Sequence, residues 1–112
     1  MVSRPNVATG EVWLVNLDPT LGSEIQKTRP CVVISPPEMH NHLRTVIVAP
    51  MTTGARPAAF RTPLTFQGKD GLALLDQIRT VDKVRLTKRM GAVDADTLER
   101  ILTTLQAIFA PC

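Results

Sequence analysis

Runs of β-branched and other apolar residues, separated by short polar or proline-containing breaks, fill the chain up to about residue 80. This pattern predicts strands at 10–17, 30–35, 45–49, 60–66 and 71–79. The second run lacks polar alternation, which is typical of a strand buried on both faces. We expect Pro36 and Pro50 to end the second and third strands, and 68–71 to form a turn.

The C-terminal segment has the periodicity of a helix instead. Asp94 is a favourable N-cap, and Asp96 and Glu99 place negative charge near the positive end of the helix dipole. Pro111 is expected to end the helix. The apolar residues that follow the cap at three- and four-residue spacing are Leu98, Ile101, Leu102, Leu105, Ile108 and Phe109.

Short strands followed by one helix predict a mostly β structure, a small twisted barrel capped by that helix. No repeat, linker or low-complexity tract interrupts residues 1–112, so we expect a single domain. A chain this short buries a modest core, so we expect a homodimer that hides more apolar surface. No apolar run approaches the roughly 20 residues needed to span a bilayer, and residues 1–6 hold no hydrophobic stretch. We therefore expect no membrane contact and a cytoplasmic location.

The charge of the chain changes this picture little. The net charge is +3 and the isoelectric point is near 9.3, which permits contact with phosphates without requiring it. One segment, 79–89, is locally basic and carries a single acidic residue, Asp82. Either a solvated charged face or a nucleic-acid contact explains its cations, which are Arg79, Lys83, Arg85, Lys88 and Arg89.

Several common chemistries have no matching motif. The chain has no glycine-rich phosphate loop and no serine in a nucleophile elbow. His40 and His42 could share a metal ion, but they follow a Pro-Pro break, so we interpret them as surface-loop residues without a ligand. Cys31 is expected to be buried and inert, and Cys112 to be a free terminal thiol. We expect no metal and no cofactor.

Polar side chains remain as candidates where the apolar strands end. Glu24 and Arg29 flank the loop before the second strand, and Thr52 and Thr53 follow the third. The pair Asp76-Gln77 interrupts an apolar stretch. Such groups are costly to bury unless they are hydrogen-bonded, so the pair needs partners, and a structural and a functional role for Asp76 both remain open.

These residues lie within segments that resemble MazF/PemK toxins over nearly the whole chain. The distinctive part is an Asp-Pro-Thr-x-Gly-x-Glu motif followed by Arg-Pro, together with the helix at the end. The matching segments are Gly10-Glu11-Val12-Trp13-Leu14-Val15, Leu17-Asp18-Pro19-Thr20, Gly22-Ser23-Glu24, Arg29-Pro30, Val48-Ala49-Pro50-Met51-Thr52-Thr53, and Asp70-Gly71 through Asp76-Gln77-Ile78-Arg79-Thr80.

The resemblance implies a five- to seven-stranded SH3-like barrel with a C-terminal helix, the fold of CcdB, MazF and PemK toxins, assembled as a symmetric homodimer. It implies a toxin of a type II toxin–antitoxin system that cleaves single-stranded RNA selectively, without a metal. The partner it implies is a MazE-like antitoxin, whose acidic C-terminal segment occupies the RNA groove and which binds DNA together with the toxin.

The resemblance also implies roles for individual residues. Arg29 and Thr52 match the pair assigned to catalysis, and Glu24 matches an acidic position needed for activity. Asp76 matches a carboxylate that is catalytic or contacts RNA in PemK-like members. Those members carry an arginine two residues earlier, where this chain has Leu74, so an Arg/Asp acid–base pair cannot be transferred. Ser23 likewise replaces a PemK histidine, which leaves most of the chemistry to Arg29.

Further RNA contacts are expected from the loops around this site. Phe60 matches a position that lines the RNA groove, whereas Trp13 and Phe109 are better assigned to the core. The remaining candidates for RNA binding are Lys27, Thr53, Arg56 and Gln77.

In the expected reaction the RNA 2′-OH attacks the adjacent phosphorus and leaves a 2′,3′-cyclic phosphate and a 5′-OH. Arg29 would stabilise the phosphoryl charge, Thr52 would donate a hydrogen bond, and Glu24 would act as general base or hold Arg29 in place. The sequence leaves two alternatives open. One is a CcdB-like toxin that binds gyrase, and the other is a barrel that binds RNA without cutting it.

Overall fold

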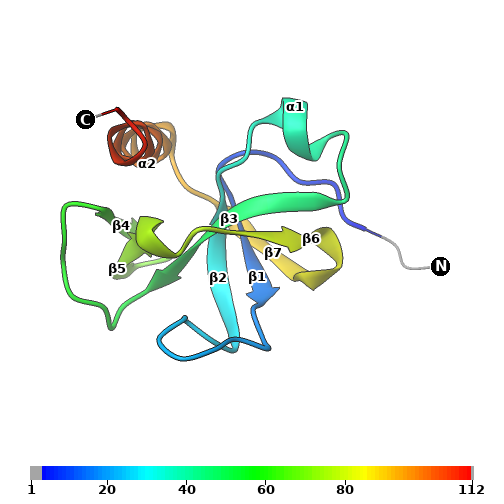
Figure 1. Cartoon of the computed structure of the whole chain (residues 1–112), viewed down its shortest axis with the longest axis horizontal. Coiled ribbons are helices and arrows are strands. Elements are labelled where there is room, and N and C mark those ends of the chain that lie inside the picture. Colours follow the sequence, from blue (N-terminus) through cyan, green and yellow to red (C-terminus); the bar gives the residue numbers. More distant parts are fainter. Residues whose placement is uncertain (1–3, 112) are drawn as a thin grey trace.

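The computed structural model describes residues 4–111, and these form a seven-stranded antiparallel sheet with a long C-terminal helix (Figure 1). Cys112, expected to be a free thiol, lies outside the described residues. The strands are β1 (Glu11–Asn16), β2 (Thr28–Val33), β3 (Thr45–Thr52), β4 (Arg61–Phe66), β5 (Lys69–Leu74), β6 (Arg79–Asp82) and β7 (Leu86–Ala92). The helices are α1 (Pro37–His40) and α2 (Ala95–Ile108), with 3-10 turns η1 (Leu75–Gln77) and η2 (Lys83–Arg85).

The sheet runs in the order β4-β5-β3-β2-β1-β7, and β6 also pairs with β3. One edge of β3 pairs with β2, while its other edge pairs with β6 over Thr45–Val48 and with β5 at 51–52. The sheet curls until the β4–β5 hairpin reaches β7, where the Gln67 amide donates to the Met90 carbonyl at 2.9 Å. The predicted small barrel with a C-terminal helix is therefore confirmed.

Both faces of the central strands are buried. Trp13, Val15, Cys31 and Val33 belong to a core inside the barrel, whereas Val12 and Val32 face a second core that includes Ile101 of α2. Successive strand residues point to opposite faces, so two cores require apolar side chains at every position. This explains the unbroken hydrophobic run at 30–35, and Cys31–Val33 are fully buried as predicted.

Helix α2 begins as predicted, because the Asp94 carboxylate accepts the Thr97 backbone N–H at 2.7 Å. Ile101 is fully buried, whereas Ile108 at the end of the helix is 39% exposed and Phe109 just after it is 71% exposed. The assignment of Phe109 to the core is therefore wrong, while that of Trp13, 8% exposed, is confirmed. Among residues 4–111 no helix is long and apolar enough to span a membrane.

The predicted strand at 71–79 is wrong in its second half. The chain leaves β3 after Ala73, which pairs with Met51, and returns at Arg79, which pairs with Val48. Turn η1 accommodates three residues more than a continuous strand would need at this point. Among the described residues, the edge of β3 between these ladders has no strand partner, so Pro50, which lacks an N–H, sits inside β3 instead of ending it.

The sequence pattern did not predict two further elements, β7 and α1. Strand β7 lies at one end of the sheet, and its exposed row of Thr87, Lys88 and Arg89 hides the strand periodicity. His40, expected on the surface, is only 1% exposed, because α1 turns its ring inward to within 2.9 Å of the Ser35 hydroxyl. His42 is exposed, as expected.

The basic segment 79–89 mostly holds the protein together. Arg79 donates to the Leu17 carbonyl at 3.0 Å, and Arg85 donates to the Asn16 carbonyl at 3.0 Å. Lys83 donates to the His40 carbonyl, and Arg89 pairs with Glu11 at 2.6 Å. Four of its five cations thus contact protein groups, which favours a structural role for this segment over contact with nucleic acid.

Candidate functional site

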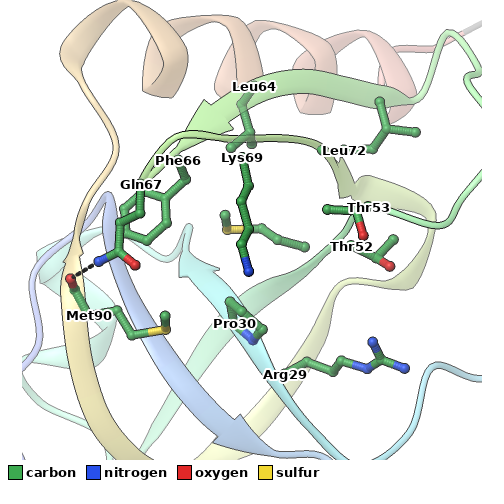
Figure 2. A pocket seen from close by; sticks show the side chains of 12 residues that line it. Arg29, Pro30, Thr52, Thr53, Leu64, Phe66, Gln67, Lys69, Leu72 and Met90 are labelled. Carbon is green, nitrogen blue, oxygen red and sulfur yellow. Dashed lines mark hydrogen bonds between the residues drawn. The ribbon is translucent and has the colours of Figure 1, made fainter.

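The candidate site opens at one end of the barrel, around the junction of β2, β3 and the β4–β5 hairpin (Figure 2). A cavity of about 250 Å³, which we call the main pocket, has an apolar floor and a polar rim. Its lining residues are Arg29, Pro30, Met51, Thr52, Thr53, Leu64, Phe66, Gln67, Lys69, Gly71, Leu72 and Met90.

Strand pairing brings Arg29 and Thr52 together. The β2–β3 register pairs Cys31 with Pro50, and its continuation places Arg29 level with Thr52. Figure 2 shows both at the same end of the main pocket, with Thr53 beside them. Three of the predicted site residues therefore meet in one cavity.

Local hydrogen bonds orient these two side chains. The Arg29 Nε donates to the Gln26 carbonyl at 3.1 Å, which leaves the two terminal nitrogens of the guanidinium to face a ligand. The Thr52 hydroxyl accepts the Gly54 backbone N–H at 3.2 Å, so its own hydrogen can still be donated. The arrangement presents a cationic fork beside a hydroxyl donor, which suits a phosphate group.

Gly71 allows this wall of the pocket to form. A Cβ at Gly71 would lie 2.9 Å from the Thr52 carbonyl oxygen, closer than real Cβ contacts occur. Only glycine lets β5 approach the end of β3 this tightly.

The remaining acidic and amide candidates line a second hollow of about 450 Å³. Glu24, Asp76 and Gln77 lie in it, apart from the lining of the main pocket. The Gln77 Oε1 accepts the Ile25 N–H at 2.7 Å and ties the β1–β2 loop to η1. The Glu24 Oε1 accepts the Leu21 N–H at 2.8 Å within the same loop. Gln77 therefore has a hydrogen-bond partner, as expected for this residue.

Asp76 pairs with an arginine that the sequence did not identify. Arg61 of β4 donates to its two carboxylate oxygens, through Nε at 3.1 Å and Nη2 at 2.9 Å. This ion pair, chiefly through its hydrogen bonds, lowers the pKa of Asp76. Arg61 lies opposite Leu74 in the β4–β5 ladder, so an Arg/Asp pair forms with an arginine from the neighbouring strand.

Arg61 also holds the loop before β4. Its Nη1 donates to the Arg56 carbonyl at 3.0 Å, and its guanidinium lies 5.7 Å from the centre of the Phe60 ring. Phe60 and the Arg56 side chain are exposed, as is Lys27 on the β1–β2 loop. These three residues are absent from the linings of the main pocket and second hollow, so they are placed around the site rather than within it.

The sequence also missed the far side of the main pocket. The predicted turn at 68–71 is wrong in position, because Lys69 already belongs to β5 and pairs with Phe66. The turn consists of Gln67 and Gly68, both with positive φ, and the only sequence signal for it was the glycine. No sequence pattern indicated that Met90 would line the pocket, because β7, the strand that carries it, was not predicted.

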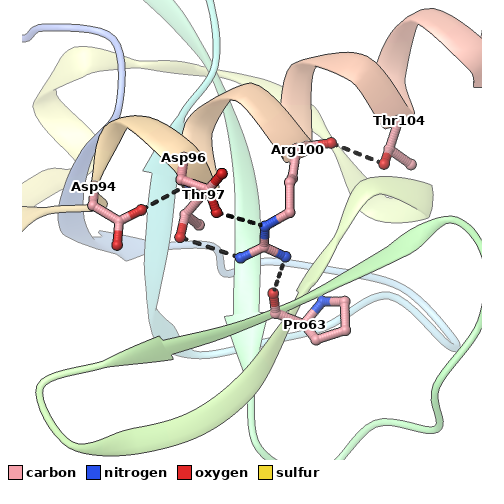
Figure 3. A network of polar contacts seen from close by, with 6 residues as sticks. All are labelled: Pro63, Asp94, Asp96, Thr97, Arg100 and Thr104. Carbon is pink, nitrogen blue, oxygen red and sulfur yellow. Dashed lines mark hydrogen bonds and ion pairs between the residues drawn. The ribbon is translucent and has the colours of Figure 1, made fainter.

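A third hollow, lined by residues of β4, the loop before it and α2, contains no predicted site residue. Arg100 anchors the helix there by donating to the Pro63 carbonyl at 2.8 Å and pairing with Asp96 at 3.3 Å (Figure 3). We assign these contacts to helix docking.

Cys31 is buried, and burial raises the pKa of its thiol to about 12, so the thiol stays protonated. Within residues 4–111 no three His, Cys, Asp or Glu side chains converge as a metal-ligand group.

Comparison with known proteins gives consistent matches. Residues 8–109 match the family of PemK-like, MazF-like toxins of type II toxin–antitoxin systems. The chain is 37% identical to the endoribonuclease PemK of Escherichia coli, over 94% of this chain and 84% of that protein.

Solved structures show the same fold. MazF from Deinococcus radiodurans superposes with a TM-score of 0.82 at 24% identity, covering 98% of this chain and 100% of that one. A mycobacterial endoribonuclease in complex with its cognate antitoxin gives a TM-score of 0.79 at 22% identity, covering 96% and 99%.

Proposed function

The chain belongs to the family of PemK-like, MazF-like toxins of type II toxin–antitoxin systems, and on that premise we propose that it is an endoribonuclease that cuts single-stranded RNA without a metal ion. The whole chain, residues 1–112, acts as one toxin domain in this proposal. The observation that carries it is the meeting of Arg29 and Thr52 in the main pocket.

The proposed reaction is a transesterification within the RNA. The 2′-oxygen forms a bond to the adjacent phosphorus while the bond from phosphorus to the 5′-oxygen breaks, so the products are a 2′,3′-cyclic phosphate and a 5′-OH. The 2′-OH gives up one proton to Glu24, and the leaving 5′-oxygen takes up one proton from water. Charge accumulates on the non-bridging phosphoryl oxygens during the attack, which is the charge an enzyme must stabilise.

Arg29 supplies that stabilisation. Its terminal nitrogens point two donors at the phosphate, and a guanidinium remains charged at any physiological pH. The Thr52 hydroxyl donates to the same phosphate, since its contact with Gly54 uses one lone pair and leaves its hydrogen free. Arg29 is thus an electrostatic catalyst and not the proton donor.

Glu24 remains our proposal for the proton acceptor. One of its oxygens accepts the Leu21 N–H at 2.8 Å, which orients the carboxylate in the lining of the second hollow. The alternative of Glu24 holding Arg29 has less support, because Arg29 is positioned by the Gln26 carbonyl. Asp76 is less suited to accept a proton, since its ion pair with Arg61 lowers its pKa.

Single-stranded RNA would enter along the loops around the two hollows. Thr53 and Gln77 line the hollows themselves, while Lys27, Arg56 and Phe60 flank them as exposed contacts for phosphates and bases.

We further propose that the toxin forms a homodimer and is neutralised by a MazE-like antitoxin. The mycobacterial relative of similar fold is described in complex with its cognate antitoxin. An acidic antitoxin segment fits a chain with a net charge of +3.

The family match favours the endoribonuclease over a CcdB-like gyrase toxin. The gyrase-binding alternative gives no role to an arginine fork beside a hydroxyl in a shared pocket. A non-catalytic RNA-binding barrel predicts binding without product, so the same experiment tests it.

That experiment incubates a long single-stranded RNA with the purified protein in excess EDTA, and identifies fragment ends by mass spectrometry. We expect discrete fragments with cyclic-phosphate and 5′-OH ends, a loss of at least about a hundredfold in rate for Arg29→Ala, and little rescue by Arg29→Lys. An RNA that stays intact beside a folded protein would reject the proposal.

A further inference from the structure

The main pocket extends beyond Arg29 and Thr52 into a region that the proposed cleavage chemistry does not use. We call this region the hairpin pocket, because the β4–β5 hairpin and the facing end of β7 enclose it (Figure 2). It is made of Leu64, Phe66, Gln67, Lys69 and Met90.

We propose that the hairpin pocket receives one unstacked base of the RNA, next to the phosphate held by Arg29 and Thr52, and that Gln67 and Lys69 recognise the edge of that base. This inference rests on the proposed function and deepens it, because it names the residues that determine which sequence is bound.

The size and lining of the cavity fit a single flat aromatic group. The whole main pocket holds about 250 Å³, which is below the roughly 300–1000 Å³ of sites for larger ligands. Leu64 is 6% exposed and lies at the apolar floor, with the half-buried side chains of Phe66 and Met90 beside it. Proteins that recognise single-stranded RNA place splayed bases against such side chains.

The Phe66 ring is held in position by the backbone of β7. A Cβ at Gly91 would lie 3.3 Å from the Phe66 Cζ, so the ring packs directly on the glycine. A ring fixed in this way loses little conformational entropy when a base stacks on it, which is the advantage of a preorganised site.

Gln67 presents a fixed acceptor at the rim. Its Nε2 donates to the Met90 carbonyl at 2.9 Å, which sets the orientation of the amide and leaves Oε1 as the outward group. Gln67 also has φ of +50°, a conformation uncommon outside glycine, so the turn holds this side chain in an unusual direction.

Lys69 presents a donor from the same hairpin. It lies directly opposite Phe66 in the ladder, and Figure 2 shows its side chain reaching over the middle of the pocket. No carboxylate within residues 4–111 forms a salt bridge with it. Lysine only donates and the Gln67 oxygen only accepts, so the bound base must offer an acceptor to one and a donor to the other.

The test uses a pool of short RNAs with randomised sequence and a 2′-fluoro group at every position, which cannot be cut because the attacking 2′-OH is missing. Bound and unbound fractions are sequenced in EDTA. We expect the wild-type protein to favour one base at one position, and Gln67→Ala and Lys69→Ala each to reduce that preference about tenfold. The matched controls Gln106→Ala and Lys88→Ala, exposed and outside the pocket, should keep it.

A second variant, Gln67→Asn, addresses loss of the turn, because asparagine tolerates positive φ while its shorter side chain withdraws the acceptor. Thermal unfolding of each variant verifies folding. A base preference that is absent in the wild type, or unchanged in Gln67→Asn and Lys69→Ala, would overturn the proposal. Binding of a glutamate-rich peptide is measured with the same variants. If they bound the peptide more weakly but kept the base preference, the pocket would belong to a protein partner and the proposal would be overturned.

The same variants separate this inference from the proposed function. Cleavage of unmodified RNA with unaltered base preference would reject the base pocket alone. Selective binding that depends on Gln67 and Lys69, without cleavage by the wild type, would support the pocket and reject the endoribonuclease.

Discussion

At the scale of single residues, Gly71 and Thr52 show how the backbone shapes the site. The Thr52 carbonyl occupies the space that any side chain at residue 71 would need, at 2.9 Å from the Cβ position. Because Gly71 has no Cβ, β5 can approach the end of β3 closely. This close approach positions Thr52, whose hydroxyl we assign to the phosphate.

We therefore expect Gly71→Ala to move the end of β3 and to lower the free energy of unfolding by about 1–3 kcal/mol. Cleavage should fall with it, because Thr52 would no longer face Arg29. The control is Gly54→Ala, where the added Cβ would lie 3.9 Å from the Thr52 hydroxyl, an ordinary contact. Denaturant unfolding and initial cleavage rates measure both effects. Equal values for the two variants would contradict this account.

His40 provides a prediction about pH. Burial, and then the nearby Lys83 amine, lower the pKa of its imidazole below the ordinary value of 6.5. The unfolded chain therefore binds more protons than the folded one just below pH 6.5, so the free energy of unfolding decreases as the pH falls from there toward the folded pKa. The slope is bounded by one proton, about 1.4 kcal/mol per pH unit.

Urea unfolding between pH 7.5 and 5.0 measures this slope. His40→Gln should flatten it, whereas His42→Gln, at an exposed position on the same segment, should leave it unchanged. If both variants kept the wild-type slope, the acid sensitivity would belong to other groups.

At the scale of elements, the ion pair between β4 and η1 connects three parts of the site. Arg61 binds Asp76 on η1, the Arg56 carbonyl on the preceding loop, and the face of Phe60. A loop and a 3-10 turn have few backbone ladder bonds of their own, so this side chain takes over part of their positioning.

We expect Arg61→Gln to lower kcat/KM at least about tenfold with a small change in Tm, since misplaced loops cost rate more than stability. Arg100→Gln is the matched control, because Arg100 also joins a carboxylate to a backbone carbonyl, on the helix side. Asp76→Asn combined with Arg61→Gln should be no worse than either change alone. Additive losses would mean that the two residues act separately.

At the scale of the whole molecule, several large apolar side chains remain uncovered in the described part of the chain. Leu21 is 81% exposed, Phe109 71% and Leu43 49%. For a domain of this size such surface is unfavourable in isolation, and a second copy would cover part of it.

We accordingly expect sedimentation equilibrium to give twice the chain mass of 12.3 kDa at micromolar concentration. The Tm should rise with protein concentration, because dissociation accompanies unfolding. A mass of one chain and a concentration-independent Tm would rule out the dimer.

Features that depend on neighbouring residues were determined by the sequence itself. The helix with its Asp94 cap, the doubly buried strand at 30–35 and the ordered motif from Asp18 to Arg29 all depend on local spacing or local side-chain chemistry. Such patterns act over a few residues, so they can be recognised without knowing what each element packs against. The family, and with it the barrel, was predictable for the same reason.

Tertiary structure alone decided the rest of the site. Arg61 meets Asp76 across 15 residues of sequence, and Gln67 meets Met90 across 23. Both contacts exist because strands pair in a particular register, and His40 is buried because α1 closes over Ser35. Register and packing depend on all paired strands at once, so no local pattern encodes which distant side chains will meet.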